Sequence, residues 1–467
     1  MLAISSSLLL AGCATNRTPV ADPAFAADVV PLPENFALAP DVTGQDRSII
    51  ADLILADDPA FAALEAMALD NAPTLSAALA RIDEARAQAA SASANRRPNI
   101  GIDSSVAGTR QNPSSFGGSL PAGIAIDRYR TQFGGNISAS WDVDIFGQLR
   151  ASERAAVIRV DAASADAAAV RLSLRATIAV NITDWRTVVA QEETLRDDVT
   201  SAQELFRLTS SRARAGIAPG FDAVQAETLL VQARAQLAPL AAERARIIGA
   251  LVTLTARPAS EVMAALQDVR AATGPILATA TTPADMLRAR PDIAAAEARL
   301  SAANADIAAA ARQRFPKLTL SGALGLLAFA LGDVFSGDTL VGSVGAGIAA
   351  PLLDFGRIDS EIDASKARAK QAFANYRTTV FTAIGDAETA YGQVAAAREE
   401  VTALQQQLAL EKDTVYLASI RYRRGLADFR TVLNAQRQLN GVNINANAAL
   451  GRYDRARVAL WLALGGS

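Results

Sequence analysis

The chain repeats its own pattern once, and this internal duplication limits the possible fold more than any other feature. In each half, a run of helix-forming residues lies between two prolines: Pro73 and Pro98 in the first half, Pro291 and Pro316 in the second. The prolines are 25 residues apart in both halves (98 − 73 and 316 − 291). The two halves therefore share one plan of elements.

A second pair of matching intervals extends the duplication. Each half has an Asp-containing Phe-Gly motif, at 144–147 and at 354–356, and a later Arg-x-Gly or Arg-Gly turn at Gly216 and Gly425. The glycines are 69 residues apart in both halves (216 − 147 and 425 − 356). We predict two structural repeats, 59–257 and 283–467, joined by an inter-repeat linker at 258–282.

Polar and apolar residues alternate in the stretches between the second proline and the Phe-Gly motif of each half. This period of two predicts strands at about 99–109 and 131–145, and at about 317–327 and 339–353. Each stretch is long enough to cross a bilayer at a tilt. The alternative is a half-buried sheet of a soluble protein, because the signal of a single transmembrane strand is weak.

Two helical segments are too long for an ordinary globular domain. Residues 148–215 contain neither Gly nor Pro, and a continuous helix of that length would extend about 100 Å. Its counterpart at 357–424 is interrupted only by two glycines. Return helices are predicted at 222–257, broken at Pro239, and at 429–464. The alternative is a solvent-exposed coiled-coil rod.

The amino terminus is typical of an exported lipoprotein. An apolar run ends in Leu10-Ala11-Gly12-Cys13, the pattern of a bacterial lipobox, in which the cysteine would carry diacylglycerol. Residues 1–12 would be a signal peptide that lacks its cationic start, and we expect it to be incomplete. Residues 13–58, with several prolines, would be a lipidated linker. The alternative is an apolar start with a chance cysteine.

Composition argues against several classes of function. The net charge of −3 provides no basic field for nucleic acid, and the chain has one Cys and no His. An intrachain disulfide and a cysteine-cluster metal site are excluded, and the commonest general base is missing. Nothing resembles a nucleophile elbow or a phosphate loop, so an enzyme is the weakest alternative and no cofactor is expected.

Four membrane-spanning strands cannot close a barrel, and unpaired strand edges are excluded from lipid. Neighbouring copies would have to complete the sheet. Two chains would give eight strands and three would give twelve, and these residues alone do not choose between them.

Several motifs together resemble the outer membrane factor family (TolC/OprM-like). They are the lipobox, the duplicated hairpin and long helix, the segment Leu287–Ile293, the Asp354–Ile358 motif and the Tyr422–Gln436 segment. The lipobox makes the chain most similar to the OprM/NodT-type lipoprotein branch of this family. The resemblance implies a mainly α fold with a transmembrane β-barrel portion, in which a homotrimer forms a 12-stranded barrel continued by a 12-helix periplasmic α-barrel.

The same resemblance implies function and partners. The chain would be the exit duct of a tripartite efflux or export system in the outer membrane, extending into the periplasm. Its partners would be outer-membrane lipid, a periplasmic adaptor and an inner-membrane pump. The alternatives are a structural coiled-coil lipoprotein and a type I secretion duct. The transported substrate and the identity of the pump are not encoded in any motif.

The turns after Gly216 and Gly425 would form the periplasmic tip, where the family narrows its pore. We predict a gate there, held by inter-helix hydrogen bonds or salt bridges and built from five residues: Asp222, Tyr422, Asp428, Arg430 and Asn434. A ring of carboxylates would favour cations. The alternative for both aspartates is a carboxylate at a helix N-terminus, favoured by the helix dipole. Asn434 stands where relatives often have a carboxylate, which weakens the prediction of an acidic ring.

Overall fold

The computed structural model describes residues 32–39, 58–110, 112, 128–268 and 282–466. The predicted signal peptide and Cys13 lie outside these residues, as do most of the predicted linker 13–58 and of the loop between the first two strands. The chain forms two compact units. The sheet unit contains the described residues of 83–162 and 297–374, and the helix unit those of 24–82, 163–296 and 375–467.

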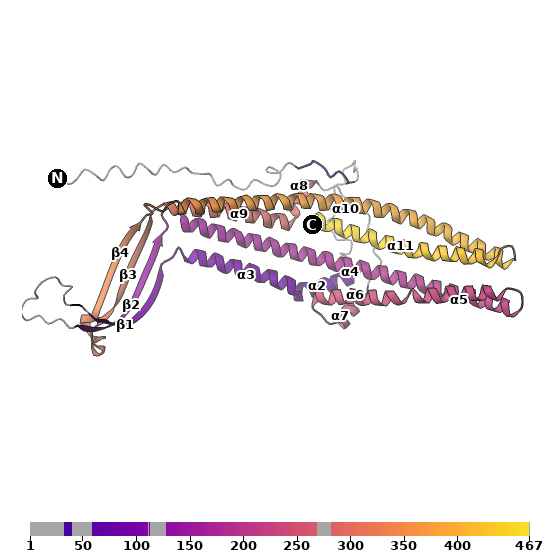
Figure 1. Ribbon diagram of the computed structural model, residues 1–467, viewed down its shortest axis with the longest axis horizontal. Helices are drawn as coiled ribbons and strands as arrows, with labels where there is room; N and C mark the ends of the chain where they lie inside the picture. Colours follow the sequence, from indigo (N-terminus) through magenta and orange to yellow (C-terminus); the bar gives the residue numbers. More distant parts are fainter. Residues whose placement is uncertain (1–31, 40–57, 111, 113–127, 269–281, 467) are drawn as a thin grey trace, which may run out of the picture. The chain divides into compact units, whose positions relative to one another are not determined.

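The sheet unit contains one antiparallel sheet in the order β1-β2-β3-β4, shown in Figure 1. The strands are β1 (Asn99–Arg110), β2 (Tyr129–Val143), β3 (Lys317–Ala328) and β4 (Leu340–Ala349). The last strand ends four residues before the predicted limit of 353. Pro351 lies two residues after the end of this strand, and a proline has no N–H to donate to the hydrogen bonds of a sheet.

The pairing register gives the sheet one apolar and one polar face. Ile102, Ile137 and Leu324 lie opposite one another on three neighbouring strands, and all three side chains are exposed. On the other face, the Asn136 amide donates to the Asp103 carboxylate at 3.1 Å. The alternation that predicted strands is thus realised as two chemically different surfaces, and no described residue covers the apolar one.

The long helices α4 (Gln148–Arg214) and α10 (Arg357–Arg423) have 67 residues each, and each ends one residue before its predicted limit. Each is followed by a tight turn and a return segment (Figure 1). The second return segment is one helix, α11 (Phe429–Ala463). The first is divided into α5 (Gly220–Ala235) and α6 (Ala238–Thr255). Pro239 occupies the second position of α6, where its missing N–H breaks no helical hydrogen bond.

Shorter helices precede the strands, and prolines start four of them because a proline at the first helical position is already in helical conformation. These are α2 (Pro59–Asn71), α3 (Pro73–Ala94), α8 (Pro283–Ala289) and α9 (Pro291–Ala311). Single 3₁₀ turns lie at Leu266–Asp268, Arg312–Arg314, Leu331–Asp333 and Gly337–Thr339.

The predicted linker contains a helix that the sequence did not indicate. The linker expected at 258–282 begins with a helix, α7 (Ala259–Ala265). Glu261 lies in its first turn, where a negative charge complements the helix dipole, and Val262 is fully buried. A short helix with one buried apolar position gives too little periodicity to be recognised in the sequence.

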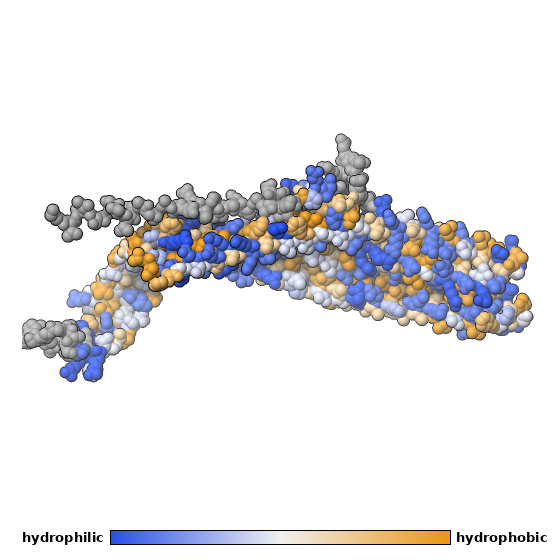
Figure 2. Space-filling model, turned by 45° about the horizontal axis from the view of Figure 1, so that its top comes forward, coloured by the Kyte–Doolittle hydropathy of each residue, from blue (hydrophilic) through white to orange (hydrophobic). Residues whose placement is uncertain are grey.

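The main core of the helix unit surrounds the middle of α4. Ile178 and Ile182 of α4 are fully buried in one cluster with Phe61 of α2 and with Ile247 and Leu251 of α6. The outer surface of the helices mixes hydrophilic and hydrophobic residues on the face seen in Figure 2. Among the described residues, no helix combines the length and the apolar character needed to cross a membrane.

Candidate functional site

The two predicted tip turns have the same geometry. Gly216 and Gly425 have φ angles of +69° and +73°, a left-handed conformation that glycine adopts at little cost. The Gly216 N–H donates to the Ala213 carbonyl at 3.0 Å, and the Ile217 N–H donates to the Arg212 carbonyl at 2.9 Å. Gly425 and Leu426 repeat both bonds at 3.0 and 2.8 Å. This is the Schellman motif, which ends a helix without leaving its last carbonyls unpaired.

Four helices meet next to these turns. Ala202 of α4, Leu229 and Leu230 of α5, Tyr422 of α10 and Phe429 of α11 belong to one buried cluster. Helices from both repeats therefore share one core at the tip.

Tyr422 is the predicted gate residue that this core positions most firmly. Its ring lies 5.8 Å from the Phe429 ring, and the Arg212 guanidinium stands 4.8 Å from its centroid, within the range of a cation–π contact. Burial raises the pKa of Tyr422; the Arg212 charge opposes this and the Asp222 charge adds to it. The buried hydroxyl has no hydrogen-bond partner of normal geometry among the described residues.

Asp428 is engaged within its own helix. It is the N-cap of α11, and its carboxylate accepts from the Thr431 N–H at 3.0 Å and from the Thr431 hydroxyl at 2.6 Å. These bonds, with the nearby Arg430 charge, lower the pKa of Asp428. The capping alternative predicted for this residue is realised, because an Asp at the N-cap satisfies a free helix N–H.

The other predicted gate residues line the same end of the helix unit. Asp222 is half-buried in the first turn of α5, and its charge acts on Tyr422. Arg430 and Asn434 are exposed on α11. The structure thus brings Asp222 near Tyr422, and leaves Arg430 and Asn434 on the surface of the single chain.

At the opposite ends of α4 and α10, the Phe-Gly motifs join strand to helix. The Asp144 carboxylate accepts from the N–H groups of Leu149 and Arg150 at 3.1 and 2.7 Å. The Asp354 carboxylate accepts from the N–H groups of Gly356 and Ile358 at 3.2 and 3.0 Å. These bonds satisfy helix N–H groups that have no partner in the helix. The motif is a junction between strand and helix in both repeats.

Trp141 lies near the junction end of β2, on the apolar face of the sheet. Its indole N–H donates to the Arg96 carbonyl at 2.8 Å, and the residue is 37% exposed. An aromatic side chain with one polar atom satisfied and one apolar face exposed suits the interface between lipid and water.

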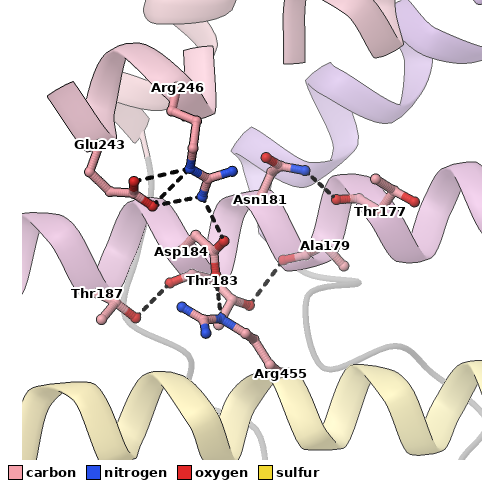
Figure 3. Close-up of polar contacts among 9 residues, drawn as sticks. All are labelled: Thr177, Ala179, Asn181, Thr183, Asp184, Thr187, Glu243, Arg246 and Arg455. Atoms are coloured by element: carbon pink, nitrogen blue, oxygen red, sulfur yellow. Dashed lines mark hydrogen bonds and ion pairs between the residues drawn. The ribbon is translucent and has the colours of Figure 1, made fainter. Parts of the chain in front are cut away.

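An ionic cluster in the helix unit was not foreseen from the sequence. The Asp184 carboxylate of α4 receives Arg246 of α6 at 3.3 Å and Arg455 of α11 at 2.5 Å (Figure 3). Glu243 lies one turn before Arg246 in α6. Its carboxylate accepts from the Nε and Nη2 atoms of the same guanidinium at 2.7 to 3.0 Å. One buried carboxylate thereby ties α4 to a return helix of each repeat.

A signal for this cluster did exist in the duplication. The first residues of the two long helices are 209 positions apart (357 − 148). Arg246 and Arg455 are separated by the same number of positions (455 − 246). The two arginines are equivalent positions of the two repeats. Asp184 has Gln393 as its counterpart, so the duplicated arginines converge on one carboxylate.

Within the described residues, no group of three or more His, Cys, Asp or Glu side chains is arranged to hold a metal ion. The notable polar features are therefore junctions, turns and ion pairs that join helices.

Comparison with known proteins decides the family. The family model for outer membrane efflux proteins matches residues 64–257 and 282–466, which correspond to the two predicted repeats. The chain belongs to the outer membrane efflux protein family. The predicted resemblance to outer membrane factors is therefore confirmed.

Individual relatives agree with the family match. The pyoverdine export outer membrane protein OpmQ of Pseudomonas aeruginosa is 31% identical over 401 residues, covering 85% of this chain and 83% of its own. Nodulation protein T of Rhizobium leguminosarum bv. trifolii is 26% identical, covering 98% of this chain and 95% of its own. The solved outer-membrane channel OprN has a TM-score of 0.83 at 26% identity, covering 93% of this chain and 97% of its own.

These likenesses confirm the predicted class of fold and of function. Mainly helical channels with a small strand portion share the fold of this chain. As a member of the outer membrane efflux protein family, the chain is the outer-membrane channel component of an efflux system, through which substrate leaves the cell.

Proposed function

We propose that three copies of this chain assemble into one gated duct, lipid-anchored in the outer membrane and continued into the periplasm by its long helices. The observation that carries the proposal is the four-stranded sheet, which has an exposed apolar face and two edge strands, β1 and β4. Such a sheet is unstable in water, because its apolar face is uncovered, and unstable in lipid, because its edges are unpaired.

Joining copies edge to edge in a membrane removes both problems, because the edges then pair with one another and lipid covers the apolar face. The strands alternate in direction, so β4 of one copy and β1 of the next are antiparallel when placed side by side. The even-numbered residues of both edge strands face the apolar side, as Ile100, Ile102, Val344 and Ile348 show. A closed barrel built this way is apolar outside and polar inside, as membrane barrels with a water-filled lumen are.

Three copies are favoured over two because eight strands enclose little more than side chains, whereas a larger barrel leaves an aqueous channel. The family resemblance also implies a trimer. Cys13 would hold the assembly in the inner leaflet through its acyl chains. We assign no catalytic activity to the chain.

The tip is the proposed site of the gate and of adaptor docking. Ile217 and Leu426 follow the two Schellman glycines and are 68% and 66% exposed. Three copies would present six equivalent turns with apolar ends to a periplasmic adaptor, which in turn would join the duct to an inner-membrane pump. The buried Tyr422 beside Arg212, with Asp222 and the exposed Arg430 and Asn434, supports polar contacts across the tip that form only in the assembly.

Cysteine cross-linking in membranes tests the edge-to-edge closure. Ile102→Cys on β1 is combined in turn with Gly342→Cys, Val344→Cys and Ala346→Cys on β4, all on the apolar face. We expect one of these pairs to give covalent dimers and trimers, and no larger species, on a denaturing gel.

The matched control combines Asp103→Cys with the same three positions, because Asp103 points to the opposite face. Cross-linking by neither series, or a ladder that continues beyond three chains, contradicts the proposed closure. The chain with Cys13 alone provides the background.

The gate is tested by single-channel recording. Asp222→Ala and Tyr422→Phe are expected to raise the open probability. Asp428→Asn keeps the helix cap but removes the charge, and so separates capping from gating. Unchanged conductance, open probability and cation preference in all three variants would refute the gate.

A further inference from the structure

A short segment of the predicted N-terminal linker is held on α10. The Glu388 carboxylate accepts hydrogen bonds from two successive backbone N–H groups, those of Ala37 at 2.7 Å and Leu38 at 2.9 Å. The Phe36 side chain is 5% exposed, and its ring centroid lies 5.4 Å from that of Tyr391. These contacts join residues at least 350 positions apart in the sequence, all within the helix unit.

The surface of α10 is shaped for this segment. A Cβ at Gly392 would stand 3.3 Å from the Cδ1 atom of Leu38, so the glycine makes room for this segment to lie close to the helix. Glu388, Tyr391 and Gly392 are spaced by three and four residues, and therefore form one face of the helix. We name residues 32–39 the strap, and this face of α10 the strap groove.

The duplication shows what the strap does. The positions of α4 equivalent to Glu388, Tyr391 and Gly392 are Ala179, Ile182 and Thr183, 209 residues earlier, and all three are buried. Ala179 and Ile182 belong to the same core cluster as Phe61 and Leu64, which lie in the first two turns of α2. The counterpart of α2 is α8, which has seven residues where α2 has 13.

Among the described residues of the second repeat, α8 therefore has no counterpart of the turns of α2 that carry Phe61. The strap brings an aromatic side chain, Phe36, to the corresponding face of α10. Its residues form bends and a turn, and the N–H groups of Ala37 and Leu38 donate to the Glu388 carboxylate. Hydrogen bonds to a charged acceptor are among the stronger ones in proteins.

We propose that the strap is a built-in peptide ligand of α10, which completes the core of the second repeat and fixes where the N-terminal chain is held. The groove selects an aromatic side chain followed by two free N–H groups, so the occupant is residues 36–38 of the same chain. Given the lipid anchor proposed above, on which only this consequence rests, Cys13 would be joined to α10 by 23 residues (36 − 13), a leash of at most about 80 Å.

Hydrogen–deuterium exchange on the full-length protein in detergent micelles tests the strap directly. In the wild-type protein, we expect the Ala37 and Leu38 amides to exchange about 10- to 100-fold more slowly than in a free peptide of the same sequence. Glu388→Ala should return both amides to the free-peptide rate. Phe36→Ala should lose most of the protection. Glu399→Ala, an exposed carboxylate further along α10, is the matched control and should leave the protection unchanged.

Protection that is absent in the wild-type protein, or that persists in Glu388→Ala, would overturn the proposal. The amides of α10 beyond residue 400 show whether a variant has unfolded, and their exchange should stay slow in Glu388→Ala. Release of the strap can therefore be distinguished from unfolding of the protein. These readouts need neither lipidation nor an open channel, and the strap can therefore fail while the proposed duct stands, or the reverse.

Whether the occupant comes from the same chain is settled by oxidising the pair Leu38→Cys and Gly392→Cys in membranes, against each single variant. A fast-migrating monomer on a denaturing gel supports the strap as proposed. A ladder of cross-linked copies would show that the strap is donated by a neighbouring copy and would overturn the assignment to the same chain.

Discussion

Helices α4 and α11 pack closely at Gly451, and replacing this glycine tests how tight this packing between the two repeats is. A Cβ at position 451 would lie 2.4 Å from the Thr187 Oγ1 atom and 2.9 Å from its Cγ2 atom. Thr187 cannot turn away freely, because it is β-branched and its hydroxyl donates to the Thr183 carbonyl at 2.9 Å. Gly451→Ala should therefore force the two helices apart.

Two opposing terms set the size of the effect. Alanine in place of glycine inside a helix stabilises it by about 1 kcal/mol. Overpacking a tight contact costs about 1–3 kcal/mol. Gly441, in the same helix, has open space around its Cβ position, so Gly441→Ala shows the helix term alone. The difference in stability between the two variants should therefore be about 1–3 kcal/mol, with Gly451→Ala the less stable.

The assay is thermal unfolding of purified protein in one detergent, followed by circular dichroism at one scan rate. Gly441→Ala should melt at or above the wild-type midpoint, and Gly451→Ala below Gly441→Ala. Thr187→Ala removes the clashing atoms, so in its background the two alanine variants should behave alike. If Gly451→Ala melts with Gly441→Ala while Thr187 is present, the tight packing of α4 on α11 is wrong.

Three further predictions follow from single contacts. Asp184→Asn leaves Arg246 and Arg455 without their shared carboxylate. Because both guanidinium groups are about half exposed, the protein should lose about 1–2 kcal/mol of stability, well below the loss for a fully buried pair. The same unfolding midpoint measures this loss. Burial, with the neighbouring Asp197 charge, raises the pKa of Asp198 from 3.8 to about 6. Between these pH values the native chain keeps a proton that the unfolded chain has lost, so stability should fall as pH rises from 3.8 to about 6. Asp198→Asn should remove this part of the dependence of stability on pH. Gly425→Ala places a Cβ in the left-handed region and should destabilise the tip by about 1 kcal/mol, seen as faster hydrogen exchange confined to the end of α10.

The elements could be predicted closely because glycine and proline punctuate this chain. Both long helices run between a left-handed glycine at each end, Gly147 to Gly216 and Gly356 to Gly425, and such glycines are visible in a sequence. The strands were recognisable because apolar and polar residues alternate and so separate onto the two faces of the sheet, and the apolar face is exposed among the described residues. The divided return segment was anticipated at Pro239, although the break falls before the proline and not at it.

Long-range polar pairs could not be predicted in this way. Periodicity shows which face of a helix is apolar, but not which arginine of another helix will meet Asp184. The strap was missed for a similar reason: residues 32–39 have the composition of a linker, and the glutamate that holds them lies in a helix 350 residues away. Of the gate residues, Asp428 could be assigned to a helix cap from its position alone, whereas Arg430 and Asn434 are exposed, and the contacts proposed for them would form only with other copies.

Single-channel recording on the purified, folded protein in a planar lipid bilayer tests the central claim most directly, since a duct closed by strands from neighbouring copies must conduct ions. We predict discrete current steps of one recurring size, from protein whose cross-linked mass is that of three chains. A folded protein that inserts yet never conducts, or that remains a monomer outside detergent and lipid, would contradict the account.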